Sequence, residues 1–193
     1  MKSVCVFCGS NSGRGVKHLQ AAQNLGKIIV KENLTLIYGG GNVGIMGEIA
    51  NTVLQYNGEV IGVIPENLVL RECALKDVTE LKIVKSMHER KAVMSELSDG
   101  FIAMSGGIGT LEEFFEVWTW AQLGIHSKPI GILNVDNYYT RLIEFIQNSV
   151  EEKFVNKENL DMIIIDDDAE SLIQKMKDYK PVKVRQWIDK EGI

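Results

Sequence analysis

Hydrophobic residues along this chain occur in short, nearly continuous runs that alternate with longer amphipathic stretches. The apolar runs predict seven strands, at residues 3–7, 34–38, 59–64, 80–84, 100–104, 129–133 and 162–166. The amphipathic stretches predict helices near residues 17–32, 44–57, 87–98, 110–123, 138–152 and 169–178. Strands that are apolar on both faces are typical of a parallel sheet with helices covering both sides.

The alternation of strands and helices from end to end predicts the fold class. It favours a single-domain, doubly wound, Rossmann-like α/β fold, with a mostly parallel sheet of about seven strands and helices on both faces. We expect this domain to span residues 1–180 and a C-terminal tail to occupy residues 181–193. The length of 193 residues fits one domain with a full hydrophobic core.

Loops at the carboxyl ends of the strands are the expected ligand sites of such a sheet. The candidate loops are residues 8–13, 39–44, 65–72, 85–91 and 105–110, and three of the five are rich in glycine. Glycine lets the backbone approach a ligand closely, and amides at the start of a following helix can hold a phosphate. The loops therefore favour a phosphate-bearing ligand.

Composition and charge exclude several classes of partner. A net charge of -5 and an isoelectric point near 5.3 argue against nucleic acid and anionic membranes, which need a basic face. No apolar run approaches the roughly 20 residues of a membrane helix, and strand-forming residues begin too early for a secretion signal. Three cysteines are too few for a disulfide framework, so we expect a cytoplasmic protein.

Cys5 and Cys8 form a C-x-x-C pair, but they fall on a strand where residues three apart point to opposite faces. Packing is favoured over a redox or zinc role, and the sequence contains no other metal-ligand cluster. We therefore expect no bound metal.

The stretch "LTLIYGGGNVGIMG" contains the spacing Gly39-x-Gly41-x-x-Gly44, which matches a dinucleotide-binding turn. The match is weak, because the glycines follow the second predicted strand and Pro65 precedes Glu66, the one acidic residue at a suitable distance. A tight strand-to-helix turn and a nucleotide contact are equally compatible with this pattern.

"SMHERK" predicts a helix start that carries an inward-facing arginine. Ser86 and Glu89 form an S-x-x-E capping box, which places Arg90 in the first turn, where the helix dipole opposes positive charge. Arg90 also shares an apolar stripe with Val93 and Leu97. A buried guanidinium needs an anion, which is either a carboxylate of the protein or a ligand phosphate, and we favour the ligand.

"SGGIGTLEE" follows the fifth predicted strand and supplies candidate carboxylates. Thr110 and Glu113 fit a T-x-x-E capping box, which gives Glu113 a structural explanation beside the catalytic one. Glu112, Glu116 and Thr119 share a different stripe of the helix, which could line a cleft. The pattern alone leaves both explanations open.

Two segments, "YGGGNVGIMGEIA" and "MHERKAVMSELSDGFIAMSGGIGTLEEFFEVWTWAQLGIHSKPIGILN", resemble the LOG family. Its members are cytokinin riboside 5′-monophosphate phosphoribohydrolases, often mislabelled as lysine decarboxylases. The resemblance runs from the first strand to about residue 155. It implies hydrolysis of the N-glycosidic bond of an adenosine 5′-monophosphate, commonly N6-modified, to free base and ribose 5-phosphate. It also implies a homodimer, with no cofactor.

Residue by residue, the resemblance implies that Arg90 and Glu113 are the catalytic pair. It implies nucleotide contacts from Glu72, Arg90, Lys91, Gly106, Gly107, Ile108, Gly109, Thr110, Leu111, Glu112 and Thr119. On the other glycine-rich loops, Ser10, Gly40 and Gly41 are further candidate contacts. The family loop usually reads P-G-G-x-G-T, and here Ser105 replaces the proline, which removes a fixed φ and adds a hydroxyl and an N–H.

Three alternatives compete with this hydrolase. A non-catalytic nucleotide or molybdenum-cofactor carrier shares the fold but has no need of the Arg90–Glu113 pair. An NAD-dependent oxidoreductase is compatible with the turn at residues 39–44, but a donor–acceptor constellation is lacking. A pyridoxal-phosphate lysine decarboxylase needs a Schiff-base lysine in a much larger fold.

Overall fold

The computed structural model describes residues 1–69, 74–75 and 77–182 and contains one seven-stranded sheet. The strands are β1 (Ser3–Phe7), β2 (Thr35–Tyr38), β3 (Val60–Pro65), β4 (Glu80–Val84), β5 (Phe101–Ala103), β6 (Ile130–Leu133) and β7 (Ile163–Asp166). Each lies within two residues of its predicted bounds. Their spatial order is β4-β3-β2-β1-β5-β6-β7, and all six pairings are parallel. The prediction of a doubly wound parallel sheet is confirmed.

The predicted helices are present as α1 (Lys17–Lys31), α2 (Gly44–Gln55), α3 (Met87–Leu97), α4 (Ile108–Gln122), α5 (Thr140–Glu151) and α7 (Ala169–Lys177). The sequence pattern missed the short α6 (Lys157–Leu160) and two 3-10 turns, η1 (Glu66–Leu68) and η2 (Val135–Asn137). Each of these has only three or four residues, too few to establish a helical period.

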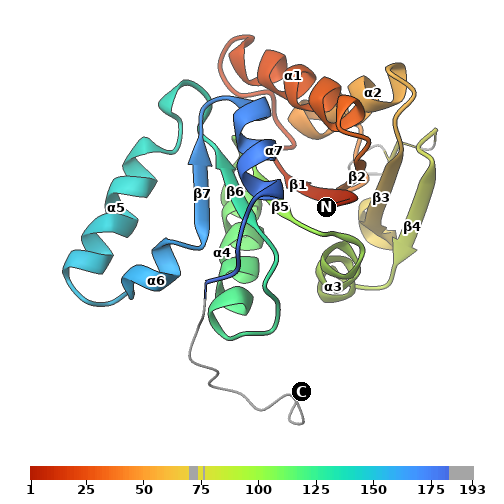
Figure 1. The fold of residues 1–193 in the computed structure, drawn as a ribbon. Coiled ribbons are helices and arrows are strands. Elements are labelled where there is room, and N and C mark those ends of the chain that lie inside the picture. Colours follow the sequence, from red (N-terminus) through yellow and green to blue (C-terminus); the bar gives the residue numbers. More distant parts are fainter. Residues whose placement is uncertain (70–73, 76, 183–193) are drawn as a thin grey trace.

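The helices form two layers, with α1 and α2 above the sheet and α3 and α4 below it (Figure 1). The layers follow from right-handed crossovers, because the chain moves from β1 outward to β4 and then returns to β5 on the other side of β1. One apolar core packs under α1, α2 and α7, and a second under α3, α4 and α5. Cys5 and Cys8 lie in different cores, as their spacing predicts.

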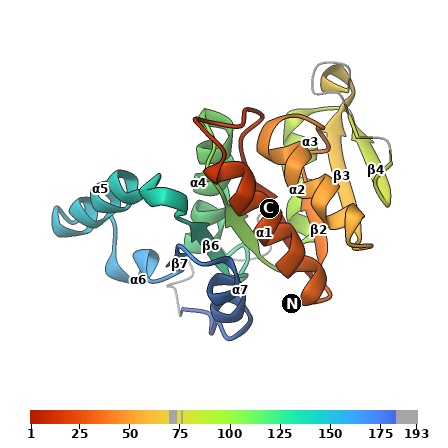
Figure 2. The same ribbon diagram turned by 90° about the horizontal axis from the view of Figure 1, so that it is seen from above.

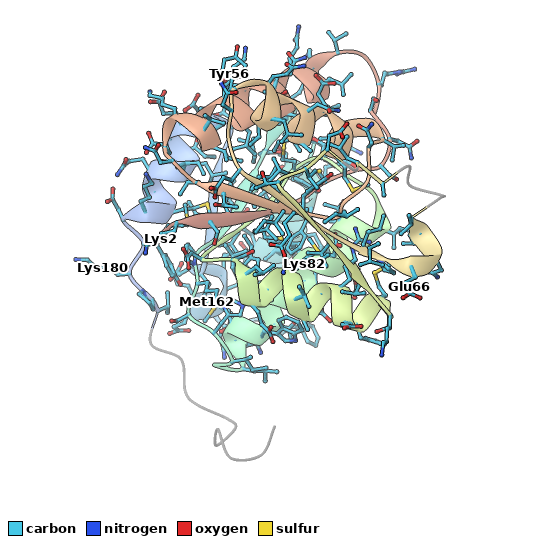
Figure 3. The ribbon with its side chains drawn as sticks, turned by 90° about the vertical axis from the view of Figure 1, so that its right-hand side faces the viewer. Lys2, Tyr56, Glu66, Lys82, Met162 and Lys180 are labelled. Atoms are coloured by element: carbon cyan, nitrogen blue, oxygen red, sulfur yellow. The ribbon has the colours of Figure 1, made fainter. Side chains whose placement is uncertain are left out.

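Strand β4 is an edge of the sheet, with α3 below it. Figure 3 views the molecule from this side, with Lys82 on β4 and Glu66 at the start of η1. Lys82 pairs with Glu80 on the same strand, and such charges discourage pairing with another sheet edge.

None of the helices in the described part of the chain is both long and apolar enough to cross a membrane. No group of His, Cys, Asp or Glu side chains in these residues could hold a metal ion. The predicted tail lies almost entirely outside the described residues, which end at Val182.

Candidate active site

A cavity of about 500 Å³ opens at the carboxyl ends of β1 and β5, where the strand order reverses direction. This reversal is where doubly wound sheets bind ligands, because the loops of neighbouring strands diverge there. The Gly9 N–H donates to the Ser105 carbonyl at 3.0 Å and ties the two loops together. The cavity is lined by Cys8, Gly9, Ser10, Asn11, Gly13, His18, Ile45, Met46, Arg90, Ser105, Gly106, Gly107, Ile108, Gly109, Thr110, Glu113 and Tyr138.

Viewed from above the α1–α2 layer, the loop after β1 passes close to the first turn of α4 (Figure 2). Three of the five loops predicted to bind a ligand contribute to the cavity lining, namely residues 8–13, 85–91 and 105–110. The loop at residues 65–72 includes Glu72, which lies outside the described residues. The cavity therefore has the position that the sequence predicts, and it is built mainly from the loops after β1 and β5 and from the start of α4.

The start of α3 fixes the position of Arg90. Ser86 is the N-cap residue, and its Oγ accepts the Glu89 N–H at 3.1 Å, so the predicted cap is confirmed. The Glu89 carboxylate accepts the N–H of Lys85 at 2.8 Å, one residue before the position of an ideal capping box. With the helix fixed here, Arg90 lies on its inner face.

The Arg90 side chain is only 6% exposed, as its place on the apolar stripe predicts. Its Nη2 donates to the Gly39 carbonyl at 3.2 Å, and its Nη1 lies 3.6 Å from the Met87 sulfur. The Nε has no hydrogen-bond partner among the described residues. A buried N–H of a charged group costs free energy when unpaired, so Arg90 is suited to an anion that enters the cavity.

The glycine fingerprint at residues 39–44 is used for packing. A Cβ on Gly39 would fall on the Arg90 guanidinium, and one on Gly44, which has φ +55°, would collide with the backbone of Ser10. The first amides of α2, on Ile45 and Met46, donate to the Gly9 carbonyl at 3.0 and 3.3 Å. These are the amides that a dinucleotide phosphate would need, so this helix start is already satisfied by the protein.

The start of α4 differs from the prediction. The helix begins at Ile108 with Gly107 as N-cap and no side-chain cap, so Thr110 is not the cap and the T-x-x-E capping box is wrong. Gly106 and Gly107 let the helix start three residues earlier, and Thr110 turns inward, where a Cβ on Gly106 would clash with it. The amides of Ile108, Gly109 and Thr110 form an uncapped helix start on the cavity wall.

This correction changes the interpretation of Glu113, because its capping role is removed and its side chain lines the cavity. The charges of Glu113 and Arg90 both affect the pKa of the buried Cys8 thiol. Its pKa is raised well above the ordinary value, first by burial and then by the Glu113 carboxylate, and the Arg90 guanidinium opposes this rise. One carboxylate and one guanidinium therefore act on the same small region at the end of β1.

Several of the candidate nucleotide contacts, both those that the resemblance implies and those on the other glycine-rich loops, lie outside the cavity lining. They are Lys91, Leu111, Glu112, Thr119, Gly40 and Gly41, whereas Ser10 and Gly106 to Thr110 are part of it. The Lys91 ammonium pairs with Glu112 at 2.6 Å and Glu116 at 2.8 Å, which joins α3 to α4. Thr119 is exposed and donates to the Phe115 carbonyl, while the Gly40 carbonyl accepts the Leu75 N–H. Their roles in binding stay predictions.

His18 and Tyr138 are cavity residues that sequence reasoning missed. Ser105, noted only as a departure from the family pattern, also lines the cavity and is 3% exposed. His18 lies in the first turn of α1 and Tyr138 follows η2, so the two are 120 positions apart (138 − 18). A weak signal for His18 was its position five residues after the glycine-rich loop at 8–13.

Comparison with known proteins identifies the family of this chain. A family model described as possible lysine decarboxylase matches residues 46–176. The chain is 49% identical over 180 residues to the cytokinin riboside 5′-monophosphate phosphoribohydrolase LOG1 of Arabidopsis thaliana, covering 93% of this chain and 84% of that protein. It is 48% identical over 181 residues to the probable phosphoribohydrolase LOGL9 of Oryza sativa subsp. japonica, covering 94% and 80%.

Solved structures with the same fold are more distant in sequence. The molybdenum cofactor binding protein of the phototrophic bacterium Rippkaea orientalis aligns with a TM-score of 0.69 and 23% identity, over 92% of this chain and 97% of that one. The molybdenum cofactor carrier protein of Chlamydomonas reinhardtii aligns with a TM-score of 0.68 and 18% identity, over 92% and 96%. At these identities the likeness demonstrates a shared fold.

Proposed function

Since this chain belongs to the LOG family, we propose that it hydrolyses the N-glycosidic bond of adenosine 5′-monophosphates, including N6-modified ones. The products are the free base, adenine or a cytokinin, and ribose 5-phosphate. The relatives in Arabidopsis and rice carry this activity in their names. The observation that carries the proposal is that Arg90 and Glu113 line one cavity beside the uncapped start of α4.

The start of α4 supports a site for the 5′-phosphate. The amides of Ile108, Gly109 and Thr110 point out of the helix start, where the helix dipole favours negative charge. No side chain of the described residues caps this end, so a phosphate oxygen would supply the acceptor for these amides. The 15-residue length of α4 gives it a full dipole.

Glu113 is suited to the chemistry at the sugar. Cleavage of a glycosidic bond passes through an oxocarbenium-like state, in which positive charge develops on the ring. A carboxylate beside that ring either stabilises the cation directly or orients and deprotonates the attacking water. Glu113 is the sixth residue of α4 and lines the same cavity as the proposed phosphate site at the start of that helix.

Arg90 lines the same cavity and would complete the site. Its Nη2 is held by the Gly39 carbonyl, which leaves the Nε for the ligand. A buried guanidinium so placed stabilises the phosphate or the carboxylate without reorganising during the reaction. We propose Arg90 and Glu113 as the catalytic pair, with the phosphate on residues 106–110.

The alternative of a molybdenum-cofactor carrier has the shared fold in its favour. A carrier has no need of a buried arginine and a carboxylate that line one cavity, so we place it second. For an NAD enzyme, the amides of Ile45 and Met46 are already occupied by Gly9. For a lysine decarboxylase, none of the described residues that line the cavity is a lysine.

We also propose that the protein is a homodimer located in the cytoplasm. Large apolar side chains are exposed near the cavity end of the molecule, with Ile83 54%, Met87 43% and Ile108 87% exposed. A second subunit could cover them and bring Lys91, Glu112 and Thr119 into contact with a nucleotide. Sedimentation equilibrium would give a mass near twice 21.6 kDa, and a monomer at micromolar concentration would contradict the assembly.

The test of the activity is chromatographic. Purified protein is incubated with adenosine 5′-monophosphate, an N6-prenylated adenosine 5′-monophosphate, and the two corresponding nucleosides. We expect free base and ribose 5-phosphate from the monophosphates and little or no base from the nucleosides. Release of no base from either monophosphate would contradict the proposal. The ratio of the two rates identifies the preferred base.

A further inference from the structure

Ser105 and His18 form a side-chain pair on the wall of the cavity that Glu113 also lines. The Ser105 Oγ lies 2.8 Å from the His18 Nδ1, so the loop after β5 is joined to the first turn of α1. Ser105 is buried and His18 is half-buried. In the family pattern this loop position is a proline, which has no side-chain hydroxyl, so the pair depends on the residue that distinguishes this chain.

The imidazole of His18 is held on a second side by Tyr138. The two rings meet edge to face, with 5.6 Å between centroids and 77° between planes. The Tyr138 hydroxyl donates to the Gly106 carbonyl at 2.6 Å, which fixes it to the same loop as Ser105. Lys17 and Asp136 form an ion pair at 2.7 Å that joins α1 to η2 beside these rings. The imidazole is therefore oriented by three separate segments.

This arrangement determines which ring nitrogen is available to a ligand. The serine hydroxyl can donate to Nδ1, and the neutral ring then carries its proton on Nε2. The protonated ring donates from Nδ1 to the serine oxygen and still carries a proton on Nε2. Within the described residues, Nε2 has no hydrogen-bond partner. When the serine hydroxyl donates to Nδ1, and equally in the protonated ring, Nε2 carries a hydrogen that it can donate to a ligand. His18 lines the same cavity as Gly106 and the start of α4.

We propose that His18 binds the phosphate of the nucleotide through Nε2–H, and that Ser105 is a positioning residue that acts through His18. This inference rests on the proposed function and adds a side chain to its phosphate site. Among the described residues, the other charged side chains that line the cavity are Arg90 and Glu113. Lys17 and Asp136, close in sequence to His18 and Tyr138, neutralise each other in their ion pair.

The experiment measures dissociation constants by calorimetry for ribose 5-phosphate, inorganic phosphate and adenosine, none of which requires turnover. The proteins are wild type, His18→Leu, His18→Gln, Ser105→Ala and the double variant His18→Leu/Ser105→Ala. His88→Gln is the control, because His88 is exposed and lies outside the cavity lining. Circular dichroism and thermal unfolding establish that each variant is folded.

We expect His18→Leu to raise the dissociation constants of ribose 5-phosphate and of phosphate about tenfold, the effect of losing one hydrogen bond to a charged group. Adenosine should bind within twofold of wild type. His18→Gln restores a donor N–H near the position of Nε2 and should stay within about threefold. Ser105→Ala should weaken binding of ribose 5-phosphate and phosphate less than His18→Leu does. The double variant should bind no more weakly than His18→Leu alone, since Ser105 acts through His18.

Unchanged binding of ribose 5-phosphate in His18→Leu would overturn the proposal, and so would an equal loss of adenosine binding. Additive losses in the double variant would overturn the positioning role of Ser105. The outcome is separable from the enzyme activity. Ribose 5-phosphate binding that depends on His18, without release of base from any nucleotide, supports the inference and rejects the proposed function. Nucleotide hydrolysis with an unchanged KM in His18→Leu supports the proposed function and rejects the inference.

Discussion

The Nη2 of Arg90 donates to the main-chain carbonyl of Gly39, and 3.2 Å separates the two atoms. These residues lie 51 positions apart, at the start of α3 and the end of β2. A glycine of the apparent dinucleotide fingerprint therefore binds and positions a buried guanidinium. The Nε of Arg90 has no hydrogen-bond partner among the described residues.

Replacing Gly39 should therefore displace Arg90. In Gly39→Ala the new Cβ would occupy the position of the guanidinium, so we expect a loss of about 1–3 kcal/mol in the free energy of unfolding and a large loss of activity. Gly109→Ala is the stability control, since nothing lies within 4 Å of a Cβ there. Urea denaturation compares the two. Equal stability of both variants would show that Arg90 moves aside at no cost.

The proposed catalytic pair can be tested by substitutions of each side chain. Glu113→Gln is nearly isosteric and removes the charge, whereas Arg90→Lys keeps the charge but loses the guanidinium with its Nε–H and Nη2–H donors. Each should lower kcat/KM by about 10²–10³-fold, the effect of losing one preorganised electrostatic group. Exposed Glu96→Gln on α3 is the matched control and should retain wild-type rates. Wild-type turnover in both site variants would reject the assignment.

The depressed pKa of Asp166 predicts that the free energy of unfolding falls in acid. Burial raises the pKa of this carboxyl, but hydrogen bonds from Lys175, Ser171 and the Asp168 N–H outweigh burial and bring it to about 2. A depressed folded-state pKa stabilises the protein above the ordinary value of 3.8, and this stabilisation is lost as the pH falls from 3.8 toward 2. Asp166→Asn should cost about 2 kcal/mol at pH 7.

The measurement is urea denaturation of wild type and Asp166→Asn at several pH values. The difference between the two proteins should be constant above about pH 5 and should shrink steadily below pH 4. Asp167→Asn, on the neighbouring residue, controls for the loss of one negative charge. A difference that does not depend on pH would mean that Asp166 stabilises the protein through packing alone.

Cys5 on β1 and Cys8, which directly follows this strand, should be inert in the folded protein. Both are buried, and burial is the first cause of the raised pKa of each thiol, so few are present as the reactive thiolate. In a Cys73→Ser background, a thiol reagent at pH 8 should label neither cysteine in the native state and both in urea. Rapid native labelling of Cys8 would restore the redox interpretation of the C-x-x-C pair.

The hydrophobic pattern by itself determined the fold class, the seven strands and the long helices, because apolar runs and helical periods are local properties. It also determined the inward direction of Arg90, since the Ser86 cap fixes which residues of α3 share a face. Tertiary structure decided the rest. Whether an amide at a helix start is free depends on a distant carbonyl, so only the fold distinguishes the occupied start of α2 from the uncapped start of α4. The approach of His18 to Ser105, across 87 positions, likewise arises only when α1 and the loop after β5 meet at the point where the sheet reverses its strand order.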